Sequence, residues 1–145
     1  MENVRPQYGI VRSFDELQKA FAVRSIVFVE GQSCSYQEEM DGRDLSSVHF
    51  LATIDGEPVA TARMRHVGDF IKIERLAVRS AWRGLGIGKE MFAFVLDRIA
   101  ETGCKKIKLH AQTYLVKFYE DFGFVQKGEM FVEANIEHFY MERVG

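Results

Sequence analysis

The sequence predicts a mixed α+β fold in a single domain. β-rich segments surround tight-turn pairs in the middle of the chain, a strand-helix-strand unit follows them, and a short helix with two final strands ends the sequence. The 145 residues, 47% of them hydrophobic, suit one domain over residues 1–145 with a buried core.

The first predicted element is a helix at residues 14–29. Ser13 and Glu16 form the S-x-x-E pattern of a capping box. Large apolar side chains then recur at near-helical spacing, at Phe14, Leu17, Phe21 and Phe28. The segment that follows, GQSCSYQEEMDGRD at 31–44, is acidic, and we expect it to be irregular.

Three strands are predicted next, as an antiparallel meander. The segments are VHFLATI (48–54), VATARMR (59–65) and FIKIERLAV (70–78), all rich in β-favouring side chains. Asp55-Gly56 suits a tight hairpin turn, and Gly68-Asp69 separates the second strand from the third.

A helix after the third strand predicts a crossover to a parallel strand. The apolar face of this helix is formed by Ile87, Met91, Phe94, Val95 and Ile99, and Gly103 marks its end. The strand KKIKLHA (105–111) follows, and a strand-helix-strand unit places its two strands parallel. The remaining elements are a short helix within 112–123 and strands at 124–132 and 136–144.

Charge and composition exclude several classes of protein. The 19 Lys and Arg residues against 21 Asp and Glu give a net charge of −2, without the basic excess of a nucleic-acid-binding protein. No apolar run approaches the roughly 20 residues of a membrane span, and no signal-peptide pattern is visible, so we expect a cytoplasmic protein with no membrane partner. Cys34 and Cys104 are too few for a disulfide framework or a zinc site, and no metal is expected.

The most informative stretch is the glycine turn, Arg83-Gly84-Leu85-Gly86-Ile87-Gly88-Lys89. Glycines allow positive φ, and the free N–H groups of the helix that follows attract an anion. A Walker A loop would need Gly at 83 and Ser or Thr at 90, where the chain has Arg83 and Glu90. The dinucleotide pattern G-x-G-x-x-G fails at Lys89. The remaining pattern, R-x-x-G-x-G, suits a pyrophosphate, and a turn without a ligand is the alternative.

These residues resemble the GNAT superfamily of acyl-CoA-dependent N-acyltransferases, in which R/Q-x-x-G-x-G/A binds the pyrophosphate of coenzyme A. The resemblance extends to the preceding strand, Ile73-Glu74-Arg75-Leu76-Ala77-Val78. It also includes Phe118-Tyr119-Glu120-Asp121-Phe122-Gly123-Phe124, which is similar to the family's F-Y-E-K-x-G-F segment. Residues 23–42, with His49 after them, resemble the ElaA-like branch.

The resemblance implies a mostly antiparallel central sheet with a βαβ crossover, helices on both faces, and acetyl-CoA as the acyl donor. The strand ending at Val78 and the strand ending near His110 are expected to separate and admit the pantetheine arm. Backbone groups of Leu76, Ala77 and Val78 would pair with pantetheine and polarise the thioester carbonyl. The pyrophosphate would be bound by Arg83, Gly84, Leu85, Gly86, Ile87, Gly88 and Lys89.

Tyr119 is the candidate general acid. The resemblance aligns it with the tyrosine that protonates the departing thiolate in many family members. A phenol with an ordinary pKa of about 10 is still protonated at neutral pH. The alternative is a core aromatic role among Phe118, Phe122 and Phe124.

Glu74 is the first candidate for the base that takes a proton from the acceptor amine. Strand alternation is expected to place its side chain on the same face as Leu76 and Val78, near the position of the base in several family members. The alternative is an ion pair with Arg63, Arg65 or Arg75.

The histidines supply further candidate bases. His110, at the end of the parallel strand, is either a base or a core histidine. His49 and His138 are weaker candidates, and the histidines show no metal-ligand spacing.

Acceptor choice is expected to depend on residues 31–44 and on the terminal hairpin turn near 132–136. The first segment carries Glu38, Glu39, Asp41 and Asp44, which form either an acidic rim that attracts a cationic amine or a solvated surface loop. Cys34 has no cationic neighbour in sequence to lower its pKa, so we expect no nucleophilic role for it.

The sequence therefore predicts an N-acetyltransferase that moves acetyl from acetyl-CoA to a primary amine of a small molecule by direct attack in a ternary complex. Two alternatives stay open: a protein or peptide N-acetyltransferase, and a non-catalytic acyl-CoA-binding regulatory domain. The exposed edge of the terminal hairpin could pair two subunits into a homodimer.

Overall fold

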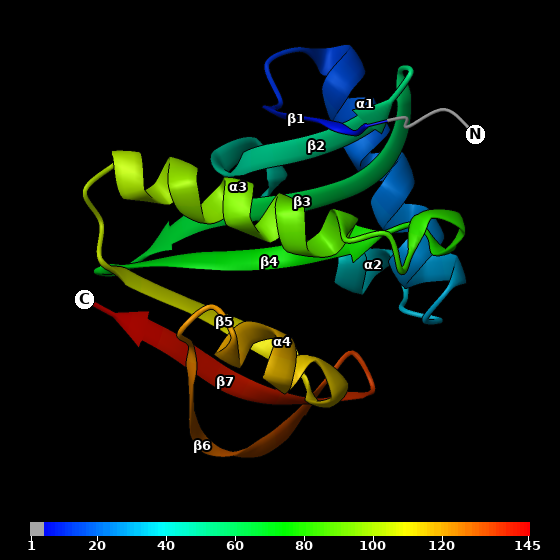
Figure 1. Cartoon of the computed structure of the whole chain (residues 1–145). Coiled ribbons are helices and arrows are strands. Elements are labelled where there is room, and N and C mark those ends of the chain that lie inside the picture. Colours follow the sequence, from blue (N-terminus) through cyan, green and yellow to red (C-terminus); the bar gives the residue numbers. More distant parts are fainter. Residues whose placement is uncertain (1–4) are drawn as a thin grey trace.

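The computed structural model describes residues 5–145 and contains one seven-stranded sheet (Figure 1). The strand order is β1-β2-β3-β4-β5-β7-β6, and every neighbouring pair is antiparallel except β4 and β5, which are parallel. The strands are β1 (Gln7–Ile10), β2 (Val48–Ile54), β3 (Glu57–Val67), β4 (Phe70–Val78), β5 (Lys106–Gln112), β6 (Val125–Glu133) and β7 (Ile136–Val144). The predicted mixed α+β fold with a parallel crossover is confirmed.

Helices cover both faces of the sheet (Figure 1). They are α1 (Phe14–Arg24), α2 (Tyr36–Glu39), α3 (Ile87–Glu101) and α4 (Val116–Glu120), with a π-helical segment η1 (Ser25–Glu30) continuing α1 and short 3₁₀ turns η2 (Asp44–Ser46), η3 (Ser80–Trp82) and η4 (Thr113–Leu115). The larger core lies between the sheet and α3 with α4, and a smaller one lies under α1 and η1. Within residues 5–145, no helix has the length and apolar character of a membrane span.

The N-terminal helix begins as the capping box predicts. The Ser13 hydroxyl accepts a hydrogen bond from the Glu16 N–H at 3.1 Å, and the Glu16 carboxylate accepts one from the Arg12 N–H at 2.8 Å. Together α1 and η1 confirm the helix expected at 14–29.

Two local elements differ from the sequence prediction. β1 was not expected, because QYGI is short and lacks a clear alternation, yet it pairs with β2 along its whole length. The segment 31–44 was expected to be irregular but contains the single turn of α2, which Ser35 caps by accepting from the Glu38 N–H at 3.1 Å.

β3 and β4 pair out of step by one residue beyond Glu74. Arg63 of β3 pairs with Glu74 of β4, and Thr61 pairs with Ala77. Between these two pairs β3 has one residue and β4 has two. The extra residue forms a bulge at Arg75, whose φ of 59° lies in the left-handed region.

The bulge changes which face of the sheet the side chains occupy. Ile71 and Ile73 before it, and Leu76 and Val78 after it, all pack against the larger core under α3. Glu74 therefore lies on the opposite face. The expectation that Glu74 shares a face with Leu76 and Val78 is wrong, because strict strand alternation is interrupted between them.

β4 and β5 pair over only a short stretch and then separate (Figure 1). Their paired residues are Ile71 to Ile73 and Ile107 to Leu109, whereas β4 continues to Val78 and β5 to Gln112. The splayed sheet that the family resemblance implied is confirmed, and the separation leaves a gap between the two strand ends.

Candidate active site

The glycine turn lies between the end of β4 and the start of α3. Gly84 and Gly86 have φ values of 79° and 82°, which side-chain-bearing residues rarely adopt, and Gly86 is the N-cap of α3. The first intrahelical bond runs from the Glu90 N–H to the Gly86 carbonyl at 3.0 Å. The N–H groups of residues 87–89 precede that bond, and therefore remain available to an anion.

The turn borders a cavity of about 370 Å³, here called the turn cavity. All the predicted coenzyme-binding residues except Leu85 line it: Leu76, Ala77, Val78, Arg83, Gly84, Gly86, Ile87, Gly88 and Lys89. The Leu85 side chain is 67% exposed and does not line the cavity. Arg83 is held beside the cavity because its Nε donates to the Val78 carbonyl at 2.9 Å.

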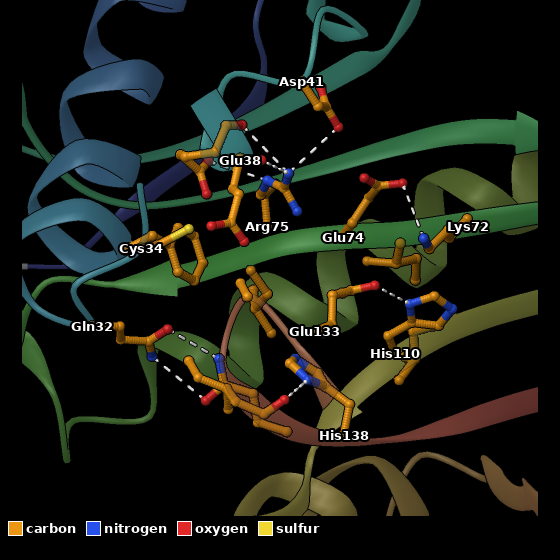
Figure 2. A pocket seen from close by; sticks show the side chains of 18 of the residues that line it. Gln32, Cys34, Glu38, Asp41, Lys72, Glu74, Arg75, His110, Glu133 and His138 are labelled. Carbon is orange, nitrogen blue, oxygen red and sulfur yellow. Dashed lines mark hydrogen bonds and ion pairs between the residues drawn. The ribbon is translucent and has the colours of Figure 1, made fainter. Parts of the chain in front are cut away.

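A second cavity of about 340 Å³, the strand cavity, lies at the gap between β4 and β5 (Figure 2). It adjoins the turn cavity, since both are lined by Phe28, Gln32, Leu76, Gln112 and Leu115. Figure 2 shows titratable side chains that converge on it from the strands, from the segment before β2 and from the β6–β7 hairpin. The two cavities are thus contiguous, one bordered by the glycine turn and the other by titratable side chains.

Tyr119 reaches the strand cavity from α4. Its ring packs against Phe92, Phe118 and Phe124 at centroid separations of 5.2, 5.1 and 6.4 Å, and the residue is 7% exposed. Burial raises the pKa of its phenol, so the hydroxyl is protonated at neutral pH. The residue is therefore a core aromatic that also lines the cavity, and its role as general acid stays a prediction.

Glu74 lines the strand cavity but is held in ion pairs. Its carboxylate contacts Arg63, the Arg65 Nε at 2.6 Å and the Lys72 Nζ at 3.8 Å. Burial raises the pKa of Glu74, but the hydrogen bond from Arg63 and the neighbouring charges more than offset this, and the pKa lies below its usual value. These contacts match the ion-pair alternative, with Arg63 and Arg65 as partners.

His110 lines the same cavity at the end of β5. Its Nδ1 lies 3.0 Å from Oε2 of Glu133, which comes from β6. This hydrogen bond lowers the pKa of Glu133 to about 2, so the carboxylate is ionised at neutral pH. A histidine paired with a carboxylate is therefore present beside Tyr119 and Glu74 in the strand cavity.

The sequence matches the family model of the acetyltransferase (GNAT) domain over residues 19–144. The chain belongs to the GNAT family.

Relatives of this GNAT domain cover nearly its whole length. A Bacillus subtilis (strain 168) protein named as a candidate acetyltransferase is 37% identical over 137 residues, or 92% of either chain. The structure of Escherichia coli ElaA has 30% identity and a TM-score of 0.88, covering 96% of this chain and 99% of that one. An acyl-CoA N-acyltransferase from Pseudomonas aeruginosa has 29% identity and a TM-score of 0.88, covering 97% and 100%. The expected family, its ElaA-like branch and the enzyme class, an acyl-CoA-dependent N-acyltransferase, are confirmed.

A buried ionic cluster forms one wall of the GNAT site. Arg24 and Arg63, both 0% exposed, pair with three carboxylates of the segment before β2. Arg24 contacts Glu39 at 2.5 Å and Asp44 at 2.6 Å, while Arg63 contacts Asp41 at 2.7 Å and Asp44 at 2.9 Å. The cluster fixes this segment against β3 and α1.

The cluster corrects the interpretation of the acidic segment. Glu39, Asp41 and Asp44 are not simply solvated, because they pair with buried arginines, and Glu39 and Asp41 also line the strand cavity. Glu38 differs, since it is exposed and its carboxylate accepts from the Ser35 hydroxyl at 3.1 Å. Burial and the nearby Glu39 and Glu38 raise the pKa of Cys34, consistent with the absence of a nucleophilic role.

The other candidate histidines have backbone partners. Nε2 of the buried His49 lies 2.8 Å from the Asp44 carbonyl, and burial lowers the pKa of its imidazole. Nδ1 of His138 lies 2.7 Å from the Ile136 carbonyl, at the edge of the strand cavity. Within residues 5–145, no group of three or more His, Cys, Asp or Glu side chains is arranged to bind a metal.

Several residues of the site were not predicted from the sequence. Glu133, Gln32 and Gln112 contribute polar groups, while Trp82 and Tyr114 add aromatic walls to the turn cavity. Gln112 had a usable signal, because strand alternation places it on the same face of β5 as His110. Gln32 and Glu133 lie within the two segments expected to govern acceptor choice, but neither residue was singled out, because its partner is distant in sequence.

Proposed function

We propose that this GNAT enzyme transfers an acetyl group from acetyl-CoA to a primary amine of a small molecule, by direct attack in a ternary complex. The observation that carries the proposal is the meeting of the two cavities at Leu76. One end offers unpaired amides and cations to a pyrophosphate, and the other offers proton donors and acceptors. The thioester lies where the two ends meet.

The turn cavity holds coenzyme A in this proposal. The amides of residues 87–89, with Arg83 and Lys89, bind the pyrophosphate, and the backbone of residues 76–78 pairs with pantetheine. The bulge at Arg75 supports this assignment, because Arg75 and Leu76 lack register partners in β3. A backbone donor directed at the thioester oxygen is worth about 3 kcal/mol of transition-state stabilisation.

The reaction requires one C–N bond to form and one C–S bond to break. The neutral amine attacks the thioester carbonyl, and the tetrahedral species expels the thiolate of coenzyme A. Tyr119 gives its phenolic proton to that thiolate, and the proton lost from nitrogen restores the phenol through water. Burial raises the pKa of Tyr119, so the phenol keeps its proton until the thiolate forms beside it.

A small acceptor suits the dimensions of the strand cavity. Its volume of about 340 Å³ lies at the lower end of the range for small-molecule sites, about 300 to 1,000 Å³. The segment around Glu38 and Asp41 borders it, as do Ala134 and Ile136 of the β6–β7 hairpin. A peptide acceptor would need a channel past these two segments.

Two linked measurements test the proposal. Melting curves with acetyl-CoA, coenzyme A, ATP and NAD should show stabilisation by the two coenzyme A species alone. Release of free coenzyme A thiol from acetyl-CoA is then followed with benzylamine, spermidine, lysine and a peptide with a free N-terminus. Faster release with a small amine supports the proposal, release with the peptide alone favours a peptide acceptor, and binding without turnover favours a regulatory domain.

A further inference from the structure

The proposed reaction needs a group that removes a proton from the acceptor. A primary amine arrives at neutral pH as an ammonium ion, which has no lone pair with which to attack. Glu74 is poorly suited to take this proton, because its oxygens are engaged by Arg63, Arg65 and Lys72. A carboxylate stabilised in its ionised form in this way is a weak base.

His110 is placed where that proton must be taken. It follows Leu109, the last residue of β5 that pairs with β4, so it lies where the two strands begin to separate. Ile107, Leu109 and Ala111 face the larger core, and alternation directs His110 to the opposite face, into the strand cavity. Figure 2 shows His110 and Glu133 directed toward one another.

Three side chains surround the His110 ring and fix its orientation. Nδ1 lies 3.0 Å from Oε2 of Glu133, Phe131 packs edge-on at a centroid separation of 5.0 Å, and Tyr140 lies at 6.1 Å. A carboxylate on Nδ1 favours the tautomer that has its proton there and leaves the lone pair on Nε2. Among residues 5–145, Nε2 has no hydrogen-bond partner, and the side chain is 25% exposed.

We propose that His110 is the general base of this enzyme and that Glu133 is its positioning residue. The inference rests on the proposed acetyl transfer to an amine. Nε2 accepts one proton from the ammonium group, the freed lone pair attacks the thioester carbon, and Glu133 stabilises the imidazolium until it returns the proton to water. Tyr119 acts separately on the thiolate.

Titratable groups from three other strands lie near the His110 ring. Lys72 and Glu74 of β4 contact each other at 3.8 Å beside it, Glu133 comes from β6, and His138 and Tyr140 come from β7. The Lys72 ammonium brings a positive charge to this end of the cavity, whereas the Glu74 and Glu133 carboxylates bring negative charges. Among residues 5–145, only Glu133 makes a hydrogen bond with a ring nitrogen of His110, so its removal should have the clearest effect on the pH profile.

The test is the rate of coenzyme A release with the fastest amine of the panel, measured from pH 6 to 9. For His110→Gln we expect kcat/KM to fall about 100-fold at pH 7 and to recover as rising pH supplies free amine. For Glu133→Gln we expect a loss of about tenfold, with the acidic limb of the profile moved to lower pH. His66→Gln changes an exposed histidine on β3 and should match the wild type.

The outcomes separate this inference from the proposed function. If no amine accelerates release by the wild-type enzyme, the proposed function fails and the inference fails with it. If the wild type is active and His110→Gln has the same rate and pH profile as the wild type, only the inference is overturned. It is also overturned if Glu74→Gln, and not His110→Gln, removes the acidic limb of the pH profile. Stabilisation by acetyl-CoA reports folding of each variant, and if His110→Gln does not fold, the Glu133→Gln profile decides.

Discussion

Gln32 and Gln112 donate amide hydrogen bonds to each other, at 3.5 and 3.1 Å, where the turn cavity meets the strand cavity. Gln32 follows η1 and Gln112 ends β5, so the pair joins the N-terminal helix to the splayed strand. In the proposed complex the acyl group lies beside this pair. The two amides therefore limit the room for a longer acyl chain.

Replacing Gln112 by Ala should shift acyl preference toward longer chains. The smaller side chain enlarges the junction, and each additional buried methylene is worth about 0.8 kcal/mol, or about fourfold in kcat/KM. The ratio of kcat/KM for butyryl-CoA to that for acetyl-CoA measures this effect. Gln126→Ala, at an exposed position of β6, is the control, and an unchanged ratio in Gln112→Ala would contradict the placement of the acyl group.

Replacing Tyr119 by Phe should lower kcat about 100-fold and leave acetyl-CoA affinity unchanged. Phenylalanine keeps the ring contacts with Phe92 and Phe118 but removes the proton that the thiolate needs. Steady-state rates and calorimetric binding of acetyl-CoA measure the two effects. Tyr36→Phe, at a residue that is 67% exposed, should have no effect. Full activity in Tyr119→Phe would limit this tyrosine to core packing.

Replacing Arg63 by Met should destabilise the fold by about 3–5 kcal/mol. The side chain is 0% exposed and contacts Asp41, Asp44 and Glu74, each of which would lose its buried cationic partner. Urea unfolding measures the change in the free energy of unfolding. Lys19→Met breaks an exposed pair with Asp15 on α1 and should be nearly neutral. A similarly small effect of Arg63→Met would show that the cluster adds little to stability.

The ionic cluster should also make stability fall in acid. Hydrogen bonding to Arg63 lowers the pKa of Asp41, and the bonds from Arg24 and Arg63 outweigh the effect of burial on the pKa of Asp44. Such groups stabilise the fold above the unfolded-state pKa values of about 4, and this contribution is lost as pH falls through their lower folded values.

Urea unfolding between pH 7 and pH 2 tests this dependence. Asp41→Asn should be less stable than the wild type at pH 7, and the difference should shrink toward pH 2. Glu39 acts with the opposite sign, because burial raises its pKa, but the lowered carboxylates Asp41, Asp44, Glu74 and Glu133 outnumber it. A difference that stays constant with pH would exclude Asp41 as a source of acid sensitivity.

Local sequence patterns predicted the elements that depend on local chemistry. The capping box at Ser13, the hairpin turn at Asp55-Gly56 and the glycine turn before α3 each follow from neighbouring residues. The glycine turn also made many lining residues of the turn cavity predictable, because residues 83–89 are consecutive and six of them line it.

The strand cavity was harder to predict because its partners come from distant segments. The bulge at Arg75 has no glycine to mark it, so simple alternation put Glu74 on the wrong face. Arg24 and Arg63 can be buried because carboxylates 11 to 22 residues away in sequence neutralise them. The partnership of His110 with Glu133 requires the register of β5, β7 and β6 together.

The bulge in β4 also divides one strand between two tasks. Before the bulge, Lys72 and Glu74 line the strand cavity; after it, Leu76 lines both cavities, and Ala77 and Val78 line the turn cavity. Because both cavities are lined by the same continuous strand, their relative position is fixed by its backbone. The side chains that line each cavity can nevertheless be substituted independently. Under the proposed function, substitutions in the strand cavity can therefore change the acceptor while the turn cavity keeps the same acyl donor.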